Sequence, residues 1–132
     1  MLYKEWRQSA HWPVAFAGFS GGAKRSGFLA AMLASTNEVK VLGFFLAGIN
    51  DDRISVAYKT YHPPPGFLNI PIWLSSGTSD SIAPSWKVEH VRASLVNTGF
   101  KRVRLESFDG GHEVDPSQVQ LALRWFRQLG NL

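Results

Sequence analysis

Four short apolar runs recur along this chain at intervals of about 30 residues, and that spacing limits the possible folds more than any other feature. They occupy residues 14–19, 41–47, 70–76 and 102–108. A strand, a crossover helix and a second parallel strand together take roughly 30 residues, so the spacing predicts parallel strands joined by helices. The expected fold class is α/β, with a parallel sheet of about four strands.

The runs differ in how their side chains alternate. The first two, VAFAGF and VLGFFLA, are apolar on both faces, which is typical of strands that are covered on both sides. The last, RVRLESF, alternates polar and apolar residues and is expected to be an edge strand. Helices are predicted at 22–35, 84–98 and 116–129, and residues 51–69, with their Pro-Pro-Pro-Gly segment, are expected to form a loop with one short helix. The three linking segments should share one face of the sheet, with the last helix on the other.

The chain is long enough for one compact core, and we expect residues 1–132 to form a single domain. No apolar run approaches the roughly 20 residues of a membrane-spanning helix, and the first residues contain no signal-peptide pattern, so a cytoplasmic protein is expected. The 14 Lys and Arg residues exceed the 10 Asp and Glu residues but are scattered, which gives little support to nucleic-acid binding. The absence of cysteine excludes thiolate metal sites and a cysteine nucleophile.

A glycine-rich pentapeptide follows the first predicted strand. Gly18-Phe-Ser-Gly-Gly22 matches G-x-S-x-G, in which small residues around a serine allow a sharp strand-to-helix turn that exposes the hydroxyl. The Gly21 N–H would then point to where an oxyanion develops. A glycine-rich connection without catalytic function is the alternative interpretation. A Walker A loop is excluded because Ala23 and Arg25 replace the required glycine and hydroxyl residue.

A carboxylate and an imidazole follow the third and fourth predicted strands. Asp80 lies in the segment GTSDSIAP, and His112 lies in GGHE. The carboxyl ends of parallel strands meet at one edge of the sheet, so Ser20, Asp80 and His112 are expected at the same edge. Asp80 could instead cap the following helix, and Asp51 after the second strand is the reserve candidate for the acid.

These motifs together resemble the C-terminal half of α/β-hydrolases of the esterase or dienelactone-hydrolase-like kind. Their chain order of Ser, Asp and His is that of this superfamily. The resemblance implies Ser20 as nucleophile, Asp80 as acid and His112 as base. Gly21 and Phe19 are the expected oxyanion- and substrate-binding residues. It also implies a truncated fold whose N-terminal strands are absent, and chemistry that requires no cofactor and no metal.

The expected function is hydrolysis of a carboxylic ester through an acyl-enzyme. Alternatives are a thioesterase or peptidase with the same triad, or a catalytically silent binding module or remnant of this fold. In this family a second oxyanion donor often comes from an H-G-G-G-like motif, and no such motif precedes Ser20. Gly110 or backbone amides near Gly48 are candidates to donate in its place. The apolar strand at 14–19 would form an open edge, so we expect a homo-oligomer or an N-terminal partner to cover it.

Overall fold

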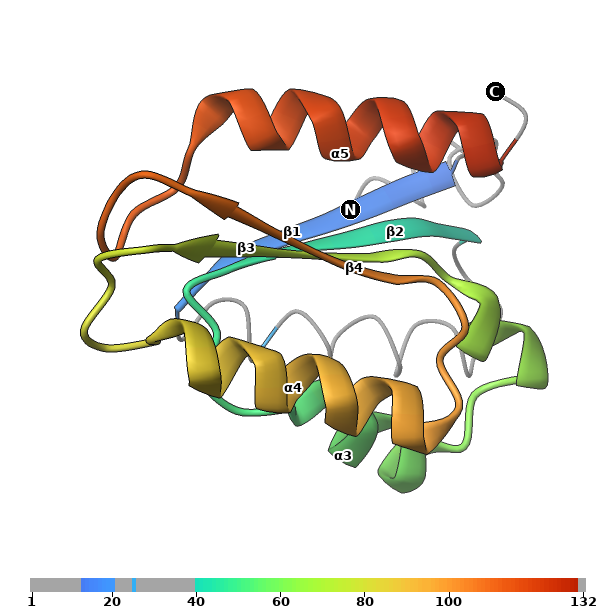
Figure 1. Ribbon diagram of the computed structural model, residues 1–132. Coiled ribbons are helices and arrows are strands. Elements are labelled where there is room, and N and C mark those ends of the chain that lie inside the picture. Colours follow the sequence, from blue (N-terminus) through green and yellow to red (C-terminus); the bar gives the residue numbers. More distant parts are fainter. Residues whose placement is uncertain (1–12, 21–24, 26–39, 131–132) are drawn as a thin grey trace.

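The computed structural model describes residues 13–20, 25 and 40–130, and these contain a four-stranded parallel sheet (Figure 1). The strands lie in the order β1-β2-β3-β4, so neighbours in sequence are neighbours in the sheet. The strands are β1 (Pro13–Phe19), β2 (Lys40–Ala47), β3 (Ile72–Gly77) and β4 (Val103–Phe108). The predicted α/β class and the parallel four-stranded sheet are confirmed.

Helices cover both faces of this sheet. Helices α3 (Arg53–Tyr61) and α4 (Ser85–Thr98) lie on one face, and α5 (Pro116–Leu129) lies on the other, as expected for right-handed crossovers followed by a terminal helix (Figure 1). Of the helix predicted at 22–35, the structure describes Arg25 alone, which is helical. Within the described part of the chain, no helix is long and apolar enough to cross a membrane.

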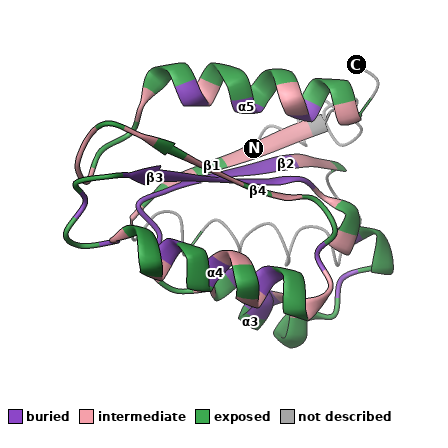
Figure 2. Ribbon diagram, in the orientation of Figure 1, coloured by how far each residue is buried: buried purple, intermediate pink, exposed green. Residues whose placement is uncertain are grey.

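The burial of the strands follows their position in the sheet. Every residue of β3 is buried, as is the second half of β2, whereas β4, at the end of the strand order, has only half-buried and exposed residues (Figure 2). The expectation of an edge strand at 102–108 is therefore confirmed. At the opposite edge, β2 is the one described strand that pairs with β1. Assembly of the protein through β1 stays a prediction.

Two hydrophobic clusters, one on each face of the sheet, hold the helices in place. On the α3 and α4 face, Phe44 and Leu74 pack with Leu95. On the α5 face, Trp73 packs with Phe126, and the indole N–H of Trp73 donates to Gln118 at 3.0 Å. The sheet is therefore packed against helices on both faces, and the loops at its carboxyl edge extend from this core.

The segment 51–69 contains more structure than the sequence predicts. Asp52 caps α3, a helix of nine residues, by accepting the Ser55 N–H at 2.9 Å. A 3-10 helix, η2 (Pro65–Asn69), follows and places the buried Phe67 ring against Phe44, with ring centroids 5.9 Å apart. The capping carboxylate and the buried aromatic ring explain why a segment rich in proline is ordered here.

Candidate active site

Ser20 stands at the carboxyl end of β1 in a backbone conformation that is rare for a serine. Its φ is 54°, in the left-handed region, and its N–H donates to the Ala47 carbonyl at 2.9 Å. Holding a residue other than glycine in this region costs of order 1–3 kcal/mol, and such strain is concentrated at functional sites. The left-handed φ of Ser20 agrees with the start of the sharp turn predicted from the pentapeptide, which stays a prediction beyond this residue. Gly21 lies outside the described residues.

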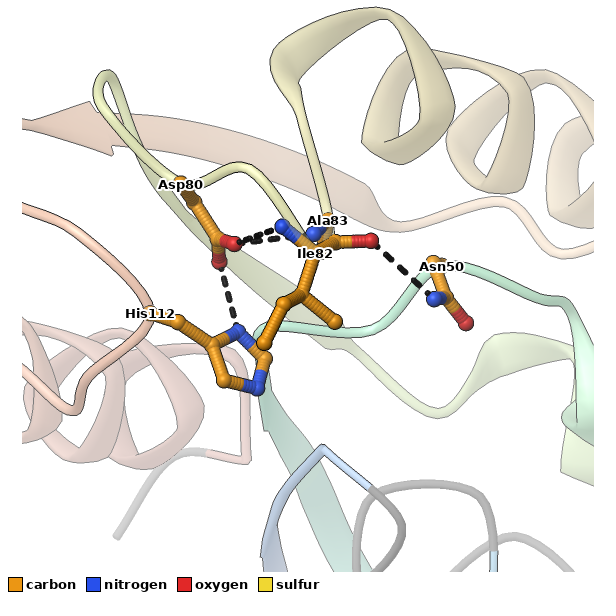
Figure 3. Close-up of polar contacts among 5 residues, drawn as sticks. All are labelled: Asn50, Asp80, Ile82, Ala83 and His112. Carbon is orange, nitrogen blue, oxygen red and sulfur yellow. Dashed lines mark hydrogen bonds and ion pairs between the residues drawn. The ribbon is translucent and has the colours of Figure 1, made fainter.

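Asp80 follows β3 and is fixed by the backbone of its own loop. One carboxylate oxygen, Oδ1, accepts the N–H groups of Ile82 and Ala83, both at 2.8 Å (Figure 3). The side chain is 1% exposed. Burial raises the pKa of this carboxyl, but hydrogen bonds from the Ala83 amide, His112 and the Ile82 amide together hold the pKa below its usual range. Asp80 is therefore ionised at neutral pH, although it is buried.

His112, in the loop after β4, is paired with the other oxygen of Asp80. The distance from His112 Nδ1 to Asp80 Oδ2 is 2.8 Å, and the His112 side chain is 19% exposed. An ionised carboxylate can only accept hydrogen bonds, so Nδ1 carries the proton and donates it. In a neutral ring this leaves Nε2 with a free lone pair, and Nε2 points toward the blue end of β1 (Figure 3). The pair is thus arranged to accept a proton at Nε2.

The two loops that carry Asp80 and His112 are joined through their backbones. The Ser79 N–H donates to the Gly110 carbonyl at 2.8 Å. Gly77, at the end of β3, lies so close to the second loop that a Cβ on it would stand 2.2 Å from the carbonyl oxygen of Gly111. This contact needs a glycine, because no side chain fits between the two backbones. The spacing of the acid and the base is therefore set by main-chain packing.

Phe19 and Gly48 contact the His112 ring itself. The Phe19 and His112 ring centroids are 4.6 Å apart, with an angle of 44° between the ring planes. Gly48 follows β2 with φ +64°, and a Cβ there would lie 2.7 Å from His112 Cε1. The Gly48 N–H donates to the Ser75 carbonyl at 3.3 Å, so this amide already has a hydrogen-bond acceptor within the protein. Phe19 was singled out from the sequence for substrate contact, and its contact with His112 is a finding of the structure.

The reserve acid, Asp51, has a different partner. Its carboxylate lies 3.0 Å from Arg53 Nε, and both side chains are about half exposed. The adjacent Asp52 is occupied at the start of α3, where its second oxygen accepts the Ser94 hydroxyl at 2.6 Å. The carboxylate that meets His112 is that of Asp80. In the described ranges, no cluster of three or more His, Asp or Glu residues is arranged to hold a metal ion.

Comparison with solved structures places this geometry in a known fold. The chain aligns with an α/β-hydrolase from Vibrio vulnificus at 18% identity and a TM-score of 0.65, covering 97% of this chain and 52% of the other. It aligns with a Bacillus cereus carboxylesterase at 21% identity and a TM-score of 0.61, covering 96% and 54%. The chain has the α/β-hydrolase fold. It also aligns with Zea mays acyl-protein thioesterase 2 at 18% identity and a TM-score of 0.63, covering 86% and 54%.

The chain spans about half the length of each of these structures, so it matches about half of their fold. No protein-family model matches the sequence, and a search of curated proteins gives no match. The likeness to these proteins is therefore one of fold.

The lowered pKa of Asp80 makes stability depend on pH in acid. A carboxyl whose pKa is lower in the folded state contributes stability that is present above its unfolded pKa, near 4, and is lost as pH falls through the folded pKa. We expect the free energy of unfolding to fall below about pH 4, and to fall less steeply in Asp80→Asn. Urea unfolding of both proteins between pH 2.5 and 6 measures this, and equal slopes would contradict the assignment.

Proposed function

We propose that this protein is a serine hydrolase that cleaves a carboxylic ester, with Ser20 as nucleophile, His112 as general base and Asp80 as the acid of a catalytic triad. The observation that carries the proposal is the 2.8 Å contact between His112 Nδ1 and the buried Asp80 carboxylate, at the edge of the sheet where Ser20 occupies a strained turn. A buried, ionised carboxylate beside a histidine with a free Nε2 is the arrangement that activates a hydroxyl nucleophile.

The proposed reaction proceeds in two steps. Ser20 Oγ attacks the carbonyl carbon as its proton passes to His112 Nε2, and Asp80 stabilises the imidazolium that forms. The N–H of Gly21, the residue after the nucleophile, donates to the developing oxyanion. The tetrahedral intermediate collapses, and the alcohol leaves with the proton from Nε2. Water, deprotonated by His112, then cleaves the acyl-enzyme, releasing the acid and restoring the hydroxyl of Ser20.

The strained turn supports the nucleophile role of Ser20 over a purely structural one. A glycine-rich connection that only needed room would accept glycine at position 20, where φ is 54°. A serine there lowers the free energy of unfolding by about 1–3 kcal/mol, and such backbone strain is concentrated at functional sites. The structural neighbours include a carboxylesterase and an acyl-protein thioesterase, which supports hydrolysis of an acyl bond, and the leaving group is a matter for experiment.

The test is turnover of p-nitrophenyl esters by the wild type and by Ser20 variants. Ser20→Ala and Ser20→Gly are both expected to abolish turnover. The free energy of unfolding should be about 1 kcal/mol higher for Ser20→Gly than for Ser20→Ala, because glycine removes the Cβ from a left-handed position. Ser85→Ala, which alters an exposed serine at the start of α4, is the matched control and should keep full activity. Turnover that is indifferent to Ser20 would favour the silent-module interpretation, and turnover of thioesters alone would assign a thioesterase.

A further inference from the structure

We propose that Phe19 is a positioning residue that fixes the His112 imidazole over the turn carrying the nucleophile. This inference rests on the proposed function, since it assigns Phe19 a task in the reaction attributed to Ser20 and His112. The geometry places Phe19 against the base rather than leaving it free to line the substrate site.

The His112 ring is contacted from three directions. Asp80 holds Nδ1 by a 2.8 Å hydrogen bond, and the Phe19 ring lies across it with centroids 4.6 Å apart. The Gly48 backbone lies at the Cε1 edge, so near that a Cβ there would be 2.7 Å from this atom. The imidazole turns about two bonds, Cα–Cβ and Cβ–Cγ, and a single hydrogen bond at Nδ1 leaves room for a tilt of the ring plane. The Phe19 and Gly48 contacts restrict that tilt, and with it the direction of Nε2.

Phe19 also connects the two halves of the proposed machinery through a single side chain. It is the last residue of β1 and immediately precedes Ser20, whose N–H is held by Ala47. The ring of Phe19 reaches the loop after β4, which carries His112. A movement of the serine turn relative to the base would therefore disturb this contact. Because a misplacement of 1 Å can lower catalysis about 100-fold, a direct contact between nucleophile turn and base is mechanistically significant.

The exposure of Phe19 fits this role. The residue is 36% exposed, and the covered part of its surface includes the contact with His112. Edge-inclined pairs of aromatic rings are favourable beyond their buried area, so a ring is preferred here over an aliphatic side chain of similar size. Tyrosine would preserve the contact, whereas leucine and methionine would fill space without the ring.

The experiment compares Phe19→Leu, Phe19→Met and Phe19→Tyr with the wild type. With p-nitrophenyl acetate, the leucine and methionine variants should lower kcat about 10–100-fold and change KM less than about 2-fold, whereas tyrosine should stay within about 3-fold of wild type. Trp86→Leu is the matched control, because Trp86 makes a similar ring contact with His90, at 5.7 Å, on the exposed surface of α4. It should leave both constants unchanged.

A second readout is independent of turnover. Exchange of the His112 Nδ1–H with solvent can be measured by proton NMR. It should be at least about 10-fold faster in Phe19→Leu and Phe19→Met than in wild type or Phe19→Tyr, because loss of the Phe19 ring exposes the hydrogen bond to Asp80 to solvent. Faster exchange in a protein that hydrolyses no ester would retain the positioning role and reject the proposed function. An effect on KM alone, or unchanged kcat and unchanged exchange in folded variants, would overturn the proposal.

Discussion

Asp80→Asn is expected to lower kcat for ester hydrolysis by about 10³–10⁴-fold while the fold is retained. Asparagine has the shape of aspartate, so its carbonyl oxygen can still accept the N–H groups of Ile82 and Ala83. Its NH₂ group then faces His112 Nδ1 and donates to it. A neutral His112 must then carry its proton on Nε2, where it cannot accept the proton of Ser20. The same substitution in serine proteases acts through this wrong tautomer, with a loss of about 10⁴-fold.

The control for this variant is Asp51→Asn, which alters the reserve carboxylate. Asp51, like Asp80, follows the carboxyl end of a strand. Asp51 pairs with Arg53 on an exposed surface, so its replacement should change kcat less than about 2-fold. Steady-state kinetics of both variants, with circular dichroism to confirm folding, makes the comparison. A large loss in Asp51→Asn with a small loss in Asp80→Asn would assign the acid to Asp51.

Gly77→Ala should have the second large effect, although position 77 carries no functional group. The new Cβ would lie 2.2 Å from the Gly111 carbonyl oxygen and 2.7 Å from that of Gly110. Both are backbone atoms, so the clash is relieved only by moving the loop that carries His112. We expect a loss of kcat of about 100-fold or more and a decrease of about 1–3 kcal/mol in the free energy of unfolding.

The matched control for this variant is Gly66→Ala, where an added Cβ meets no atom within 4 Å. It should change the free energy of unfolding by less than about 0.5 kcal/mol and leave kcat unchanged. Urea denaturation and kinetics on the same preparations separate the two effects. A Gly77→Ala variant with wild-type kcat would show that the two loops are not held in register by this contact.

The fold was largely predictable because its signals are local. The apolar runs near 44 and 73 and the alternation at 102–108 depend on which faces of a strand are covered, and that is written in consecutive residues. The positions of Ser20, Asp80 and His112 after their strands were also readable, since topology alone brings the carboxyl ends of parallel strands together.

The contacts that fix the site could not be predicted, because they join residues distant in the sequence. Gly77 approaches Gly111, and Gly48 approaches His112, yet a glycine after a strand also occurs in ordinary turns. The hydrogen bond that selects Asp80 over Asp51 depends on the turn made by residues 80–83, whose amides bind the carboxylate. The helix at 53–61 agrees with the one short helix expected in this segment, whereas the 3-10 helix at 65–69 was not predicted because its prolines favour a loop.

The central claim is that Ser20 is a nucleophile activated by the Asp80–His112 pair. The most direct measurement is reaction of this chain with a fluorophosphonate, followed by mass spectrometry of the labelled peptide. We predict one adduct, on Ser20, that is absent in Ser20→Ala and present in Ser85→Ala. No adduct on the folded wild-type chain, or an adduct that persists in Ser20→Ala, would contradict the account.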